Sequence, residues 1–288
     1  MVNDAMATGW ATGAAGWIRN ERIFDHVFTP VTAAILAAAD LAHATRVLDV
    51  GCGTGTLLAA AVDAGAQAVG VDISQPMADA ARSRVPAATV VVADAQTADL
   101  LALAPGDPFD RVTSRFGVMF FADPVAAFAN IRAATAPGAR LTFAAWREGE
   151  SDVFTVGNEV FLERLTAPPT VAQPDVPGPM GLASGDRIGQ VLGDAGWQAV
   201  TLTELEPELD YGVDGTDGVE ARMAVAQSGS VARAARAELE PRLGPDGWDD
   251  LVGRARERLV DRAAATGSVR MTGHVWLVTA VNPAGSPA

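Results

Sequence analysis

Three acidic residues in the first third of the sequence could act together: Asp49, Asp72 and Asp94. Each stands at or near the end of a short apolar run, and the runs read VLDV, VGVD and VVVAD. The carboxyl ends of parallel strands meet at one edge of a sheet, where ligands bind. Ionised carboxylates are strong hydrogen-bond acceptors. The three positions therefore predict a ligand-binding site at that edge.

A glycine-rich turn follows the first of these runs, with Gly51, Gly53 and Gly55 at alternate positions. Glycines in such a turn let the backbone approach a ligand closely. The dinucleotide fingerprint needs a glycine three residues after its second glycine, and this chain has Thr56 there. The spacing therefore counts against a nicotinamide dinucleotide.

The spacing D-x-G-x-G-x-G resembles motif I of the class I methyltransferases that use S-adenosylmethionine, and the resemblance continues through most of residues 10–146. It implies that Asp49 supports the turn and the amino group of the methyl donor. Gly51 and Gly53 would border the methionine part of the donor, and Gly55 completes the motif.

The same resemblance assigns roles to residues after the second and third runs. Asp72 matches the acidic residue that accepts both ribose hydroxyls, and Ile73 would lie against the adenine. Asp94 and Ala95 match the pair that recognises the adenine edge. Two further residues complete the expected donor site: Met77 and Trp17.

The segment from Ser114 to Trp146 is similar to the corresponding part of the ubiquinone and menaquinone C-methyltransferases. Within it, Arg115 and Phe116 would face the methyl group of the donor or the acceptor. Beyond residue 146 the resemblance ends, so the identity of the acceptor does not carry over.

The elements that must position these residues alternate as in a parallel sheet with helical crossovers. Candidate strands begin at Arg46, Ala68, Thr89, Phe109 and Ala139, and helical runs cover residues 54–65, 76–85 and 123–138. A helix over 184–196 leads to a sixth strand over 197–206, and a seventh strand covers 273–281. We expect an α/β fold: a Rossmann-like seven-stranded, mostly parallel sheet whose last strand is antiparallel, with helices on both faces and a helical cap.

Three segments stand outside the alternation. Residues 1–40 contain aromatic residues that have no strand to join, and we expect them to form lid helices across the mouth of the sheet. Residues 41–288 would form the methyltransferase domain, with cap insertions at the Pro-rich segment 147–185 and the mostly helical segment 206–272.

Composition excludes several classes of protein. The net charge of −14 disfavours nucleic acid as a partner, because such binding needs clustered basic residues. All 21 basic residues are arginine, which excludes Schiff-base, pyridoxal phosphate and P-loop lysine chemistry. The single Cys52 argues against disulfides and a Cys-rich metal site, and no apolar run is long enough to span a membrane. We expect a cytoplasmic protein without a metal cofactor.

No sequence motif surrounds a catalytic base. His26 lies in the segment expected to cover the site, and His274 begins the last strand near the active edge. Both are candidate bases, since histidine titrates near neutral pH. Candidate acceptor-binding residues are Phe24, Phe28, Met119, Phe154, Tyr211 and Arg270. Each of these has a simpler interpretation, as a core residue, a surface residue or one member of a structural ion pair.

The sequence thus predicts methyl transfer from S-adenosylmethionine to a small, largely apolar organic acceptor, by in-line displacement that yields S-adenosylhomocysteine. Two alternatives stay open: an enzyme of the same fold that uses the donor for cyclisation or decarboxylation, and a non-catalytic nucleoside-binding protein. The sequence leaves open which atom of the acceptor is methylated, and whether the protein is a monomer or a homodimer.

Overall fold

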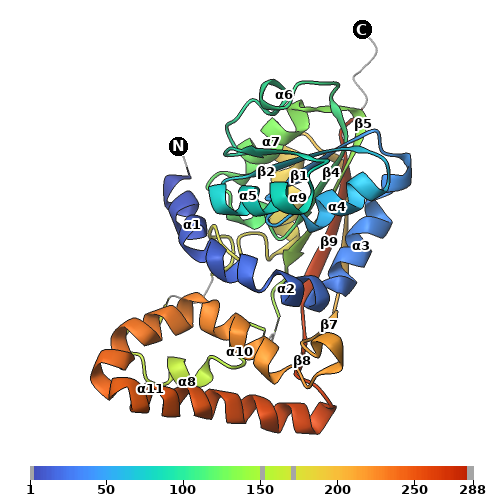
Figure 1. Ribbon diagram of the computed structural model, residues 1–288. Coiled ribbons are helices and arrows are strands. Elements are labelled where there is room, and N and C mark those ends of the chain that lie inside the picture. Colours follow the sequence, from blue (N-terminus) through green and yellow to red (C-terminus); the bar gives the residue numbers. More distant parts are fainter. Residues whose placement is uncertain (1–2, 150–152, 170–172, 284–288) are drawn as a thin grey trace.

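A seven-stranded sheet forms the centre of the protein in the computed structural model, which describes residues 3–149, 153–169 and 173–283. The strand order is β3-β2-β1-β4-β5-β9-β6, and β9 is antiparallel to both of its neighbours. The predicted mostly parallel sheet is therefore confirmed (Figure 1). Its strands are β1 (Arg46–Val50), β2 (Gln67–Asp72), β3 (Thr89–Val92), β4 (Phe109–Arg115), β5 (Thr135–Trp146), β6 (Gln198–Leu205) and β9 (Val275–Val281).

Helices cover both faces of this sheet, and successive residues of β1 therefore pack in two different apolar cores. Val47 packs in the core that contains Leu58, whereas Leu48 packs in the core that contains Phe128. A strand buried on both faces reads as a continuous apolar run. The helices that alternate with the strands are α4 (Thr56–Asp63), α5 (Gln75–Arg84), α6 (Leu100–Leu103), α7 (Pro124–Ala133) and α9 (Gly185–Asp194), with the short η1 (Leu41–His43) and η2 (Val118–Phe120).

The predicted helix over residues 123–138 is too long. Asp123 caps α7 as expected, since its carboxylate accepts the N–H of Ala126, but the helix ends at Ala133. Strand β5 then begins at Thr135, and its backbone is held by Asn282 beyond the end of β9. The Asn282 side chain donates to the Thr135 carbonyl, a contact between the start of β5 and a residue 147 positions away.

Three helices precede the sheet: α1 (Asp4–Arg19), α2 (Glu21–Val27) and α3 (Thr29–Ala39). In Figure 1, α1 stands at one side of the sheet, α2 lies below it, and α3 returns along the other side. Helix α1 packs against α5 and α10, whereas α3 packs on β4 and β5. In the described part of the chain no single helix is long and apolar enough to cross a membrane, although α2 and α3, bent by 68°, pass that test as a pair.

A second unit lies beyond the carboxyl ends of the parallel strands, and we call it the cap (Figure 1). It comprises α8 (Glu159–Leu162), β7 (Glu208–Asp210), η3 (Val213–Gly215), α10 (Val219–Ser228), α11 (Ser230–Thr266) and β8 (Arg270–Thr272). Helix α11 is broken at Gly244, whose φ is +70°, between Pro241 and Pro245. The segment 206–272, predicted to be mostly helical, also contains the small two-stranded sheet of β7 and β8.

Candidate active site

The three predicted carboxylates come from adjacent strands, because β3, β2 and β1 are neighbours in the sheet. Asp49 pairs in register with Gly70, and Asp72 pairs with Val92, so the strand ends are nearly level. All three aspartates are buried, with exposed fractions of 2%, 9% and 3% for Asp49, Asp72 and Asp94. The structure therefore brings these side chains to one edge of the sheet.

Asp72 fastens the glycine turn to the end of β2. Its Oδ2 accepts the N–H of Gly53 at 2.9 Å, and its Oδ1 accepts the N–H of Ser74 at 2.8 Å. Burial raises the pKa of Asp72, and these backbone N–H groups oppose the rise. Each carboxylate oxygen can accept more than one hydrogen bond. Asp72 therefore keeps capacity to accept hydroxyl groups.

Asp49 is the most buried of the three carboxylates. Burial raises its pKa from 3.8 to about 7, although the hydroxyl of Thr113 donates to its Oδ1 at 3.1 Å and the charge of Arg115 also favours ionisation. A cation placed beside Asp49 would stabilise its charged form. This environment suits a carboxylate that pairs with an amino group.

Asp94 has a partner that the sequence interpretation missed. Its Oδ1 accepts the N–H of Gln96, and its Oδ2 accepts the side-chain amide of Asn3, both at 2.9 Å. Asn3 immediately precedes α1, so the start of the first helix lies at the end of β3. No local pattern in the sequence signals this contact.

The three glycines of the turn have positive φ angles, from +55° to +91°. A Cβ atom on Gly51 would lie 2.8 Å from the Cα of Gly117, whereas a Cβ on Gly53 would meet no atom within 4 Å. Gly51 thus permits close packing of two loops. Gly53 borders a space that a side chain would fill, which is the feature expected where a ligand approaches the backbone.

Three other predicted donor residues follow the ends of β2 and β3 in the chain. Met77 and Ala95 are buried, with 3% and 6% exposure, and Ile73 is partly buried. Cys52 lies inside the turn with its sulfur beside Gly70, and burial raises its pKa well above the ordinary value. Such a thiol is unreactive and serves as a small packing side chain.

Aromatic rings form a continuous row from α1 to the segment after β5. Neighbouring ring centroids in this aromatic row are 3.9–6.0 Å apart. In order, its members are Trp10, Trp17, Phe24, Phe28, Phe116, Trp146 and Phe154. Trp146, absent from the predicted set, stacks on Phe116 at 4.5 Å. The row therefore joins the N-terminal helices to the ends of β4 and β5.

Phe116 occupies a strained position at the centre of this row. Its φ is +65°, which is costly for a residue with a bulky side chain. Such backbone strain concentrates at functional sites. The next residue, Gly117, packs against Gly51, so the aromatic row passes directly beside the glycine turn.

Arg115 is held by protein groups rather than left free. It donates to the hydroxyls of Thr32 at 2.7 Å and Thr56 at 3.3 Å, and it lies 3.6 Å from Asp25. Asp25 also accepts the Thr56 hydroxyl at 2.6 Å. This network ties α2 to the start of α4, directly after the glycine turn.

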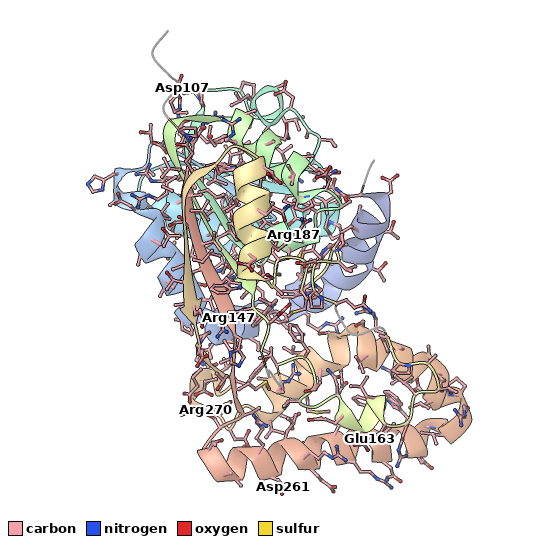
Figure 2. The ribbon with its side chains drawn as sticks, turned by 180° about the vertical axis from the view of Figure 1, so that it is seen from behind. Asp107, Arg147, Glu163, Arg187, Asp261 and Arg270 are labelled. Atoms are coloured by element: carbon pink, nitrogen blue, oxygen red, sulfur yellow. The ribbon has the colours of Figure 1, made fainter. Side chains whose placement is uncertain are left out.

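The two candidate bases have different surroundings. His26 is exposed on α2, and its charge acts on Asp210 of the cap. The ring of His274 lies 3.3 Å from the guanidinium of Arg147 and 3.5 Å from Glu206. Arg147 sits where the sheet meets the cap (Figure 2). The structure therefore places His26 on the surface of α2 and His274 beside Arg147 and Glu206.

Two predicted acceptor residues belong to the cap. Arg270 forms ion pairs with Glu208 and Asp210, both at 3.2 Å, and it lines an open hollow of about 350 Å³ on the outside of the cap. Tyr211 is buried under the guanidinium of Arg222, which is 5.4 Å from its ring centroid.

Met119 and Phe154 differ in exposure. Met119 is buried, and its sulfur accepts the backbone N–H of Trp146 at 3.3 Å. Phe154 is 42% exposed, although its ring packs against Trp146. In the described ranges no group of three or more His, Cys, Asp or Glu residues could hold a metal ion.

The chain is similar in sequence to known methyltransferases. A family model described as a methyltransferase domain matches residues 47–138. A demethylmenaquinone methyltransferase from Renibacterium salmoninarum is 29% identical over 172 residues, which cover 57% of this chain and 71% of the relative. A 2-phytyl-1,4-naphtoquinone methyltransferase from Synechococcus elongatus is 32% identical over 133 residues, which cover 44% of this chain and 57% of the relative.

Solved structures share the fold at low sequence identity. Phosphoethanolamine N-methyltransferase 2 from Haemonchus contortus, in complex with S-adenosylhomocysteine, has a TM-score of 0.54 and 19% identity, covering 98% of this chain and 60% of that one. The [4+2]-cyclase SpnF has a TM-score of 0.50 and 18% identity, covering 89% and 82%. These comparisons show a methyltransferase domain over residues 47–138, a sequence similar to that of the quinone methyltransferases, and a fold shared with the solved structures.

Proposed function

We propose that this protein transfers the methyl group of S-adenosylmethionine to a small, largely apolar organic acceptor that binds against the aromatic row. One observation carries the proposal: the contact between Gly51 and Gly117 sets the aromatic row beside the glycine turn. The chain therefore offers a polar site with three carboxylates and an apolar wall at the same edge of the sheet.

The donor fits the polar part of this edge. Asp72 would accept the ribose hydroxyls, Asp94 and Ala95 would contact the adenine edge, and Asp49 would pair with the amino group. The open space at Gly53 agrees with a ligand lying against the turn. The remaining donor contacts are assigned to Gly51, Gly55, Ile73, Met77, Trp17, Arg115 and Phe116.

Alignment of the two reactants is the main task left to the protein. S-adenosylmethionine, when bound, supplies a methyl group already activated on a sulfonium. Holding two reactants in line contributes roughly 7–11 kcal/mol to lowering a barrier. The aromatic row would hold the acceptor and exclude water, so a strong base is not required. His26 and His274 stay candidate bases.

The acceptor site is assigned to apolar side chains where the aromatic row meets the ends of β4 and β5. Phe24, Phe28, Met119 and Phe154 belong to it, and Trp146 is added from the structure. Small-molecule pockets are mainly apolar with a few placed polar groups. The names of two relatives refer to a demethylated menaquinone and a phytylated naphthoquinone, which supports an apolar acceptor. Tyr211 and Arg270 stand in the cap, and the proposal does not depend on them.

The N-terminal helices and the cap would close this site from two sides. Residues 1–40 are assigned as the lid, and the insertions at about 147–185 and 206–272 as the roof over the acceptor. A site closed in this way suits a small molecule better than a nucleic acid or a protein. We expect a cytoplasmic enzyme that needs no metal and acts as a monomer or homodimer.

A second candidate function is a reaction on the same fold without methyl transfer. The [4+2]-cyclase among the solved structures shows that the fold is not restricted to methyltransferases. A non-catalytic protein that binds the nucleoside is the third candidate. All three would bind the donor, so binding alone does not separate them.

Incubation with donor that carries a labelled methyl group separates the candidates. We expect the label to appear in a small apolar acceptor, with one S-adenosylhomocysteine formed for each labelled product. Conversion of an acceptor without uptake of label would identify the non-methylating enzyme. Donor binding without conversion of any acceptor tested would favour the binding protein. Labelling of tRNA, DNA or peptides at comparable rates would contradict the proposed acceptor class.

A further inference from the structure

Asn3 stands at the N-cap of α1, but its side chain does not cap that helix. Instead, Nδ2 donates to Oδ2 of Asp94 at 2.9 Å and to Oε1 of Gln96 at 3.2 Å. Its own Oδ1 accepts the backbone N–H of Ala122 at 3.2 Å. Asn3 is 6% exposed, so these contacts are shielded from water.

Local helix chemistry does not explain this orientation. An asparagine at an N-cap normally accepts a backbone N–H of the first turn, and this contributes about 1 kcal/mol to the helix. In α1 that contribution is absent, and the amide is directed to residues 91 and 93 positions away. A buried hydrogen bond to a carboxylate is stronger than a neutral one. The side chain therefore serves the end of β3 rather than its own helix.

The loop after β3 is held from two sides. Gln96, which is also buried, accepts the N–H of Asp123 at 3.1 Å as well as the Asn3 amide. On the other side, Asn130 donates to the carbonyl oxygens of Ala95 at 2.9 Å and Ala98 at 2.8 Å. The residues assigned to the adenine edge are thus fixed by two asparagines from distant parts of the chain.

We propose that Asn3 is a positioning residue for the methyl donor: it orients the Asp94 carboxylate that recognises the adenine. The inference rests on the proposed function, because it assumes that Asp94 faces the adenosyl group. Asn3 donates to Oδ2 while the Gln96 N–H donates to Oδ1, so the carboxylate is held at both oxygens and each oxygen keeps a lone pair for a ligand. Free rotation of Asp94 would lower the fraction of molecules ready to bind.

Asn20 provides a matched control at the other end of α1. It is 4% exposed, and its amide donates to the carbonyl of Ala224 at 3.3 Å and to the hydroxyl of Ser228 at 3.2 Å. Its replacement by alanine removes a buried asparagine from the same helix without touching Asp94. If weaker packing of α1 as a whole affects donor binding, Asn3→Ala and Asn20→Ala should both show the effect.

The experiment is titration calorimetry of the full chain with two probes, S-adenosylhomocysteine and 5′-methylthioadenosine, which lacks the amino-acid part. We expect Asn3→Ala to weaken both probes by about tenfold, as for the loss of one charged hydrogen bond. Asn20→Ala should change the affinity for either probe by no more than about twofold, because sites far apart have little energetic coupling. In an Asp94→Ala background, Asn3→Ala should cause no further loss. Thermal unfolding establishes that each variant is folded.

Two kinds of result would overturn the inference. Unchanged affinity in Asn3→Ala, with weaker binding in Asp94→Ala, would show that Asp94 does not need Asn3. Additive losses in the double variant, or an equal loss in Asn20→Ala, would assign the effect to α1 as a whole. If the unaltered protein bound neither probe, the proposed function itself would fail, and that result is distinct from the other two.

Discussion

The backbone N–H of Gly53, in the turn after β1, donates to the Asp72 carboxylate at the end of β2 at 2.9 Å. This bond gives Asp72 two tasks, because the carboxylate shapes the glycine turn and also stands where ribose hydroxyls would bind. The second oxygen accepts the N–H of Ser74 at 2.8 Å, so both carboxylate oxygens are held by backbone groups. Substitution of Asp72 should therefore affect binding through both tasks.

Asp72→Ala should weaken binding of S-adenosylhomocysteine by about 1.5–3 kcal/mol, the range for hydrogen bonds to a charged group. Titration calorimetry measures the change. Asp79, an exposed aspartate on α5, is a suitable control, and Asp79→Ala should leave the affinity unaltered. Equal affinities of Asp72→Ala and the unaltered protein would remove Asp72 from the donor site.

Alanine at Gly53 and alanine at Gly51 should differ in their effect on stability. A methyl group at Gly53 meets no protein atom, so the variant should fold, with a cost of about 1–2 kcal/mol for the positive φ, and should lose donor binding. A methyl group at Gly51 would overlap the backbone of Gly117, so that variant should lose thermal stability as well. Calorimetric binding and thermal unfolding of both variants test the pair. Retained binding in Gly53→Ala would mean that the donor lies elsewhere.

Asp49 should make stability depend on pH. Because burial raises its pKa to about 7, the folded protein retains a proton between pH 4 and 7 that the unfolded chain has already released. The charged form of Asp49 therefore lowers the free energy of unfolding most above pH 7, and this destabilisation decreases as the pH falls from 7 to 4. The Tm of the unaltered protein should drop relative to Asp49→Asn between pH 5 and 8. Parallel Tm profiles of the two proteins would contradict the assignment.

Trp17 should contribute to donor binding through its ring. It stacks on Phe24 with centroids 3.9 Å apart, which places an indole of α1 in the aromatic row. Loss of an aromatic contact is worth about 0.5–1.5 kcal/mol, so Trp17→Ala should raise the Kd for S-adenosylhomocysteine about two- to twelvefold. Trp17→Phe keeps an aromatic ring, so its Kd for S-adenosylhomocysteine should be close to that of the unaltered protein. A Kd that is the same in all three proteins would exclude Trp17 from the donor site.

The sequence by itself determined the sheet and the placement of its carboxylates. The runs that end near Asp49, Asp72 and Asp94 are local patterns, and each strand end follows from a short apolar run and the turn after it. The parallel order of these strands then brings the side chains together. Local pattern was sufficient because it is fixed by neighbours within a few residues.

Tertiary structure decided the rest. Strand β5 begins at Thr135, where a helix was predicted, and Asn282 binds the carbonyl of that residue. Trp146 enters the aromatic row only because β5 ends beside Phe116. Asn3 would have been interpreted as an ordinary helix cap, yet its amide binds Asp94. These contacts join residues that lie tens of residues apart, and their energy exists only after the sheet has formed. No short stretch of sequence contains both partners, so only the folded chain could reveal them.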